Sequence, residues 1–208
     1  GSKKEDKDKN KIERKDGYTE GTIDLGSYEN KMIMEATGNS YHNGDTIKVG
    51  PGAAVLSFDN DKLNYVCAEE VCTSDEEISN LYKIDIKTIP GIKFKSYFIY
   101  NGKKYNYVSQ FTFKVNDPIK IANNYGNQNV SIKMVVEDFI KPYLENNLSN
   151  YLLDFAEKNG VDNITRKYVP GGDKEPYFIF GDYYKSPSEL DNFGISLYSI
   201  SIESVDEA

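Results

Sequence analysis

The sequence predicts an α+β fold, in which antiparallel strands lead into one long amphipathic helix. Apolar and polar residues alternate from Tyr105 to Val115, as in a strand with one buried face. Asn101-Gly102, just before this run, is the strongest short-range signal for a hairpin turn. From Ile132 to Phe155 the apolar residues recur every three or four positions, a spacing that only a helix places on one face.

The first half of the chain is predicted to consist mainly of strands, separated by turns rich in glycine, proline and asparagine. The last two of these strands flank Pro90-Gly91, and we expect that pair to separate them. The predicted strands are 22–25, 31–35, 45–49, 53–58, 63–67, 81–89 and 92–100.

The long helix has start, stop and interruption signals. Asn129 or Ser131 is available as its N-cap, and Asn159-Gly160 as its stop. Because Pro142 has no amide hydrogen to donate, we expect a kink, or two helices that meet near residue 141. Further along, the sequence predicts a weaker helix at 161–168, a strand at 177–180, a helix start at 186–190 and a strand at 194–204.

Charge and composition exclude some classes of protein. The net charge of −8 argues against a nucleic-acid partner, because phosphate binding needs a basic surface and here acidic and basic residues are interspersed. No run of about 18 apolar residues, the length of a membrane-spanning helix, occurs.

Gly1-Ser2 is typical of a cleaved tag, so residues 1–16 are interpreted as a tag remnant and a disordered charged linker in an excised part of a longer protein. Residues 17–208 then form one domain, with subdomains 17–104 and 105–208 as an option.

No pattern indicates catalysis, a cofactor or a metal site. A Ser-His or Cys-His pair would have to use His42, the only histidine, which lies in a turn-rich segment. Cys67 and Cys72 lack both CxxC spacing and the further ligands that zinc requires. They are either reduced thiols, which we favour, or a disulfide across a tight loop. Three N-x-S/T sequons are expected to be chance matches. They begin at Asn129, Asn147 and Asn163.

Three segments carry a resemblance to a known family: Gly44–Leu56, Val115–Pro118 and Asn192–Ser204. Together with the β-rich first half and the long helix, they resemble the SPFH or Band 7 domain of stomatins, prohibitins and flotillins. The sequence looks most similar to the bacterial virion-core-protein-like branch, over roughly residues 38–204. The resemblance implies a curved, mostly antiparallel sheet covered by a long amphipathic helix and shorter helices.

The resemblance also implies a function, that of a non-catalytic scaffold on the cytoplasmic face of a membrane. Copies of such domains pack side by side into rings or lattices and organise membrane patches or partner proteins. The implied partners are other copies and the membrane surface, with attachment and coiled-coil segments expected in flanking sequence. The polar side of the helix is the expected self-association surface, acting through exposed ion pairs. It comprises Lys133, Glu137, Asp138, Lys141 and Glu145.

A second hypothesis is a secreted or surface-displayed module that binds carbohydrate or protein through tyrosines. Tyrosine supplies rigid, amphipathic contact area. The candidate residues are Tyr97, Tyr100, Tyr105, Tyr107, Tyr183 and Tyr184. The simpler interpretation, which we favour, is that alternation places Tyr100, Tyr105 and Tyr107 on the sheet face beneath the helix.

Overall fold

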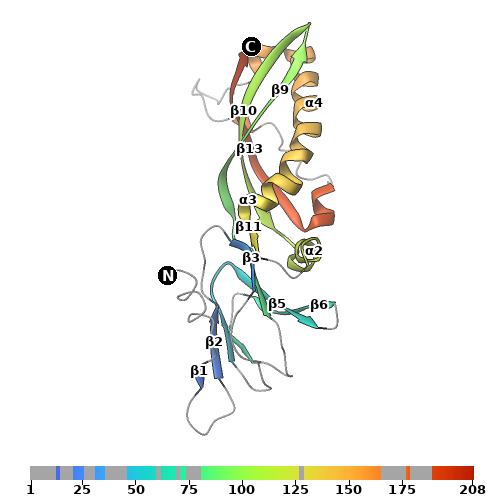
Figure 1. The fold of residues 1–208 in the computed structure, drawn as a ribbon. Helices are drawn as coiled ribbons and strands as arrows, with labels where there is room; N and C mark the ends of the chain where they lie inside the picture. The colour runs from blue at the N-terminus through green and yellow to red at the C-terminus, as the bar shows by residue number, and fades with distance from the viewer. Residues whose placement is uncertain are drawn as a thin grey trace, which may run out of the picture. The chain divides into compact units, whose positions relative to one another are not determined.

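A computed structural model of the protein, drawn in Figure 1, describes residues 13–14, 21–25, 31–35, 46–59, 62–68, 71–73, 81–126, 129–164, 177–178 and 189–208. Strands and helices are mixed, and one part combines a strongly curled antiparallel sheet with a long helix, which confirms the α+β class.

The chain divides into two compact units, each made of two segments. Unit 1 comprises Gly1–Lys87 and Val115–Val135, and unit 2 comprises Thr88–Lys114 and Val136–Ala208. These units do not coincide with the optional subdomains 17–104 and 105–208. The reason is that one long hairpin runs through residue 104 and keeps both of its sides within unit 2.

One sheet of unit 1 has the strand order β1-β2-β4-β7. Its strands are β1 (Glu13–Arg14), β2 (Gly21–Leu25), β4 (Thr46–Val49) and β7 (Val71–Thr73). β2 and β4 run parallel, and the other neighbours run antiparallel. β1 lies within residues 1–16, so the segment expected to be a disordered linker contains a short strand paired with β2.

The second sheet of unit 1 has the order β11-β3-β8-β5-β6, with antiparallel neighbours. Its strands are β3 (Lys31–Glu35), β5 (Ala53–Asp59), β6 (Lys62–Ala68), β8 (Leu81–Asp85) and β11 (Val130–Ser131). Every residue of the central strand β8 is buried, so both faces of the sheet are covered there. The core of the unit includes Met32, Ile33, Val55, Leu56 and Ile84.

A short helix of unit 1, α2 (Pro118–Asn123), was not predicted. Asp117 ends the preceding strand and also caps this helix, since its Oδ1 accepts hydrogen bonds from the amides of Ile119 and Lys120. Pro118 occupies the first helical position. An Asp-Pro pair is therefore a helix-start signal here as well as a strand terminator.

The N-cap predicted for the long helix is confirmed at Ser131. Its Oγ accepts a hydrogen bond of 3.1 Å from the amide of Met134 in α3 (Ile132–Val135). The other candidate, Asn129, has a different role, because its Oδ1 accepts from the amide of Glu35 at 2.9 Å and so holds the β11 segment to β3.

The predicted Asn101-Gly102 hairpin is confirmed in unit 2. It joins β9 (Ile89–Tyr100) to β10 (Lys103–Val115), with Tyr100 opposite Lys103. Asn101 has φ of 51° and Gly102 has φ of 74°, the positive values that a two-residue type I′ turn requires. The alternation predicted for β10 is also present. Its buried residues are Tyr107, Ser109, Phe111, Phe113 and Val115.

Pro90-Gly91 does not separate two strands, as we expected, but lies inside β9. The break falls at residues 86–88, between β8 and β9. Ile89 pairs with Phe113 and Ile92 with Phe111, so β9 has one extra residue over this interval and forms a β-bulge. Gly91 supplies the positive φ of 74° that such a bulge uses, and a bulge accommodates the missing amide hydrogen of Pro90.

The sheet of unit 2 has the strand order β12-β13-β10-β9. β13 (Ile195–Glu207) confirms the predicted final strand, and β12 (Tyr177–Phe178) confirms part of the strand predicted at 177–180. The amide of Ala208 donates to Lys104 O, while Ser201 Oγ lies 3.5 Å from Gln110 O. β13 therefore runs antiparallel to β10.

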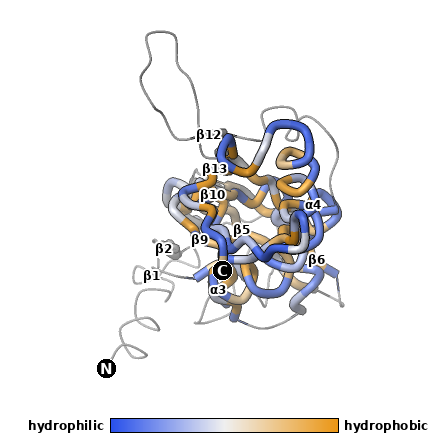
Figure 2. The backbone as a smooth tube through the Cα atoms, turned by 90° about the horizontal axis from the view of Figure 1, so that it is seen from above, coloured by the Kyte–Doolittle hydropathy of each residue, from blue (hydrophilic) through white to orange (hydrophobic). Residues whose placement is uncertain are grey.

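The long helix begins after a change of helix type near the predicted position. A π-helical segment, η1 (Val136–Ile140), precedes α4 (Lys141–Asn159), and Pro142 lies in the first turn of α4. A wider π turn accommodates a residue that cannot donate a hydrogen bond to the carbonyl four residues earlier. α4 ends at Gly160 as predicted, and both hydrophobic and hydrophilic residues line it (Figure 2). Its buried residues are Tyr143, Leu144, Leu148, Leu152 and Ala156.

Two shorter predictions are met only in part. The helix predicted at 161–168 appears as a 3-10 turn, η2 (Val161–Asn163), and residues 165–168 lie outside the described residues. The helix start expected at 186–188 also lies outside them, and a 3-10 segment, η4 (Glu189–Phe193), follows. The ring of Phe193 stacks on Phe139, with 4.5 Å between centroids, and so joins η4 to η1.

Candidate functional site

The expected self-association residues are divided between the two units. Lys133 is exposed on α3 of unit 1, whereas the other four lie on η1 and α4 of unit 2. Within unit 2, Lys141 Nζ lies 2.7 Å from Glu137 Oε1 in an i,i+4 ion pair. Both side chains are at least one-third exposed, so this pair contributes only a few tenths of a kcal/mol. Asp138 and Glu145 are exposed on the same stretch of helix.

The exposed side of α4 carries asparagines that the charge-based prediction overlooked. Asn147 Nδ2 donates to Tyr143 O at 2.8 Å, and Asn150 Nδ2 donates to Asn146 O at 2.6 Å. Side-chain bonds of this kind compete weakly with the helix's own backbone pattern. They occupy the amide groups within the helix, which reduces the number of strong side-chain donors that the surface offers to a partner.

The asparagine side chain of each of the three sequons forms a hydrogen bond within the fold. Asn129 receives the amide of Glu35, Asn147 donates to Tyr143 O, and Asn163 donates to Asn159 O. The hydroxyl of the Asn147 sequon, Ser149, is engaged with Tyr107. That the sequons are chance matches stays a prediction.

The tyrosines of the binding-module hypothesis do not form one exposed face. Tyr107 is 1% exposed, and its hydroxyl lies 2.7 Å from Ser149 Oγ on α4. Burial raises the pKa of Tyr107. Tyr100 and Tyr105 are half-buried, and the Tyr105 ring stacks on Phe98 at 5.6 Å. Of the described candidates, Tyr97 alone is largely exposed, at 49%. Tyr183 and Tyr184 lie outside the described residues.

A basic and partly apolar row on the outer face of β9 was not predicted. Lys93, Lys95, Tyr97 and Ile99 are all exposed, while the intervening Phe94 and Phe98 are buried. Lys104 lies with its Nζ 4.6 Å from the centre of the Tyr97 ring, a cation–π contact. A sequence signal existed, because residues 89–115 contain five lysines and no acidic residue in a chain that has 33 of them.

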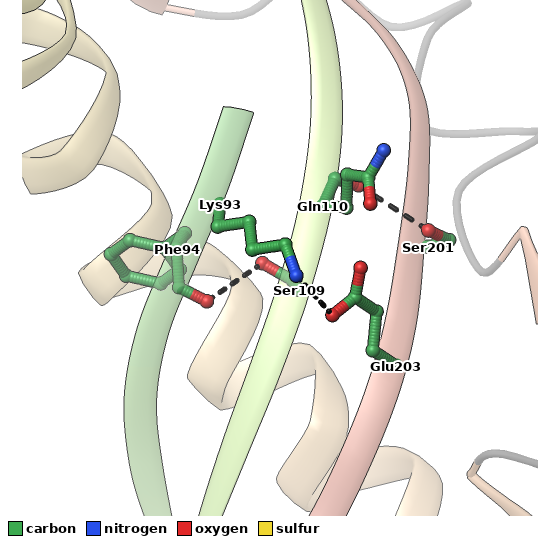
Figure 3. Close-up of polar contacts among 6 residues, drawn as sticks. All are labelled: Lys93, Phe94, Ser109, Gln110, Ser201 and Glu203. Carbon is green, nitrogen blue, oxygen red and sulfur yellow. Dashed lines mark hydrogen bonds and ion pairs between the residues drawn. The ribbon is translucent and has the colours of Figure 1, made fainter. Parts of the chain in front are cut away.

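The outer face continues onto β13, which is acidic. Lys93 Nζ reaches across β10 to Glu203 Oε2 at 3.3 Å, as Figure 3 shows beside Gln110 and Ser201. At the far end of the same strands, Lys103 Nζ lies 3.6 Å from Glu207 Oε1. These exposed pairs connect the basic hairpin to the acidic strand across the sheet, and each is weak and sensitive to salt.

Unit 1 contains a buried pair of charged residues. Lys83 and Asp85 are each 6% exposed on β8, although they alternate with Ile84 in the sequence, a pattern typical of a strand with one polar face in water. Burial lowers the pKa of Lys83 to about 8; the nearby Asp85 carboxylate opposes this shift, and Lys87 adds to it. Asp85 Oδ1 accepts the amide of Lys87 at 2.9 Å, and its Oδ2 lies 3.6 Å from Lys87 Nζ. The sequence pattern failed here because the sheet is covered on both faces.

No group of residues that could hold a metal ion occurs in the described part of the chain. Cys67 lies in β6 and Cys72 in β7, two strands of different sheets, and His42 lies outside the described residues. Among the described helices, none has both the length and the apolar character needed to cross a membrane.

Comparison with models of protein families gives no match, and comparison with curated proteins gives none either.

Proposed function

We propose that this protein is a non-catalytic scaffold, which self-associates at a membrane surface and organises membrane patches or partner proteins. The proposal combines the resemblance to SPFH or Band 7 domains with the α+β fold. The observation that carries it is the exposed charge in unit 2. In unit 2, α4 covers one face of a curled sheet (Figure 1). The outer face of the sheet and the polar side of the helix each carry both acidic and basic side chains at the surface.

The polar side of η1 and α4 supports self-association because it presents exposed charges, and its described ion pair, Glu137–Lys141, is a weak surface pair. Glu145 is exposed one turn beyond Lys141, and the Glu137–Lys141 pair remains accessible to solvent. Ion pairs between copies would each contribute little, so a stable assembly needs many of them repeated around a ring or lattice. In this proposal, it is the assembled oligomer that binds the membrane surface.

The test is flotation with lipid vesicles, run on the complete gene product and on residues 1–208 side by side. We expect the complete product to form large oligomers that float with the vesicles. A complete product that is monomeric and stays with the soluble fraction contradicts the scaffold proposal, whatever the behaviour of residues 1–208.

A matched pair of variants tests the helix surface itself. Reversing Glu137, Lys141 and Glu145 together, to Lys, Glu and Lys, should weaken assembly while leaving helix content unchanged, since Glu137 and Glu145 are exposed and Lys141 is half-buried at the surface. The control reverses Asp154, Glu157 and Lys158 further along α4, which are also exposed. If both triple variants assemble as the wild type does, the polar side of η1 and α4 is not the self-association surface. The flotation experiment then still decides the scaffold proposal.

A further inference from the structure

We infer that the edge of β9 in one copy pairs with the acidic end of β13 in a second copy, so that the sheets of unit 2 join head to tail. This inference rests on the proposed self-associating function and names the surfaces that carry it. It starts from two sheet edges that differ in charge and lie on opposite sides of β10.

The first edge belongs to β9, the last strand in the order β12-β13-β10-β9. In a hairpin with a two-residue turn, the residues that flank the turn form a hydrogen-bonded pair, here Tyr100 and Lys103. Hydrogen-bonded and non-hydrogen-bonded pairs then alternate along the ladder. The residues whose backbone groups point away from β10 are therefore Lys93, Lys95, Tyr97 and Ile99.

The same four residues are those with exposed side chains on the outer face of β9. α4 packs against β9 from the inner face, where Phe94 and Phe98 are buried, so it does not cover this row. Lysines on an edge commonly prevent pairing with another strand. If this row served only to prevent strand pairing, it would not need large apolar side chains. Tyr97 and Ile99 are 49% and 57% exposed, however, and offer apolar contact to a partner.

The second edge belongs to the end of β13. Among the described residues, β12 pairs with β13 only at Ser201 and Ile202, so residues 203–207 have no described strand neighbour on the side away from β10. β13 contains Glu203, Asp206 and Glu207 and no lysine or arginine. Glu203 and Glu207 already lie near Lys93 and Lys103 of their own chain, but these pairs are exposed and weak, so the lysines of a second copy can share the same carboxylates.

The direction of the strands fits a head-to-tail joint. β9 and β13 each run antiparallel to β10, so they run parallel to each other within one copy. Copies that add in one orientation would place β9 of one beside β13 of the next as a parallel pair. Such an interface is heterologous, and it generates a closed ring when the rotation between copies closes and a filament when it does not.

The experiment uses two charge-reversed variants of the chain, measured alone and mixed, by sedimentation velocity at low salt. Variant one is Lys93→Glu with Lys95→Glu, and variant two is Glu203→Lys with Glu207→Lys. Each alone brings like charges together at the joint, so its apparent dissociation constant should rise about tenfold or more. In an equimolar mixture the edges of the two variants are complementary in both directions, so alternating assembly should return.

The mixture separates the inference from a folding defect, because mixing cannot repair a chain that fails to fold. Lys62→Glu with Lys158→Glu serves as the control for the first variant, since it also replaces two exposed lysines by glutamates and both positions lie outside β9 and β13. The inference is overturned when the two variants assemble as the wild type does, or when the mixture stays dissociated. A wild-type chain that is monomeric throughout also overturns it, and vesicle flotation then decides the scaffold proposal separately.

Discussion

At the scale of single residues, Lys83 is the least expected feature of the chain. It lies on the central strand β8, opposite Met34 and Val55, where a protonated amine is poorly solvated. Burial lowers its pKa to about 8 from the ordinary lysine value of 10.5. Between these values the unfolded chain binds more protons than the folded chain, so the free energy of unfolding should rise with pH from about 8 to about 10.5. Below pH 8 the cost of burying the charge is constant.

Lys83→Met should raise the free energy of unfolding at pH 7 by about 1 kcal/mol, because desolvation outweighs the attraction of Asp85 for the amine, methionine keeps a similar volume, and Asp85 retains Lys87 as a partner. The variant should also show less increase in stability than the wild type between pH 8 and 10.5. Urea unfolding of both proteins at several pH values measures this difference, with the exposed Lys62→Met as control. A variant that is less stable than the wild type at pH 7, with an unchanged pH profile, would show that burial of the amine is not the cost we assign.

Tyr107 provides a second prediction at the same scale. Its hydroxyl lies 2.7 Å from Ser149 Oγ and connects β10 to α4. Tyr107→Phe should lower the free energy of unfolding by about 1 kcal/mol, the usual net value of one buried hydrogen bond. Tyr97→Phe, at an exposed position, should change it by less than about 0.5 kcal/mol. Equal effects in thermal or urea unfolding would mean that the Tyr107–Ser149 contact does not stabilise unit 2.

At the scale of elements, the bulge in β9 depends on the backbone of Gly91. An added Cβ would meet only Gln110 Nε2, at 3.9 Å, so there is room for a side chain and the cost of substitution lies in the positive φ. Gly91→Ala should therefore cost about 1 kcal/mol in unfolding free energy, and Gly91→Asn less, because asparagine tolerates this conformation better. Urea unfolding of the two variants compares them directly. An alanine variant as stable as the wild type would indicate that the bulge relaxes.

Elements with strong local signals were predictable from the sequence. The Asn101-Gly102 turn, the alternation along β10 and the helical spacing after Ile132 each reflect one local rule, and each is present in the structure. Pro90-Gly91 was misassigned because the same residues serve a turn or a bulge, and only the partner strand distinguishes the two. The buried Lys83 was missed because burial on both faces of β8 depends on contacts that are distant in sequence.

For the candidate surfaces too, some features could be predicted from local sequence and others depend on contacts that are distant in sequence. The charged helical residues were predictable from spacing alone, but their assignment to two units was not, since it depends on where the chain crosses between them. The outer row of β9 could have been found from the five lysines and absent acids of residues 89–115. That β9 is an edge strand, and so offers backbone groups as well as charges, follows only from the strand order.

At the scale of the whole molecule, charge governs the expected behaviour. The chain carries a net charge of −8, so copies repel one another at long range. In the assembly that we propose, the basic hairpin of one copy attracts the acidic end of β13 in the next copy at short range. Self-association through exposed charges should therefore weaken as salt rises, because screening acts most strongly on solvent-exposed pairs.

The most direct measurement is the mass of the wild-type chain in solution, determined by sedimentation velocity from low to high ionic strength. The account predicts oligomers at low salt that dissociate progressively as ionic strength approaches about 1 M, where the screening length falls to about 3 Å. A monomer at every salt concentration, or an oligomer that salt does not affect, would contradict the claim that exposed charges of this chain hold copies together.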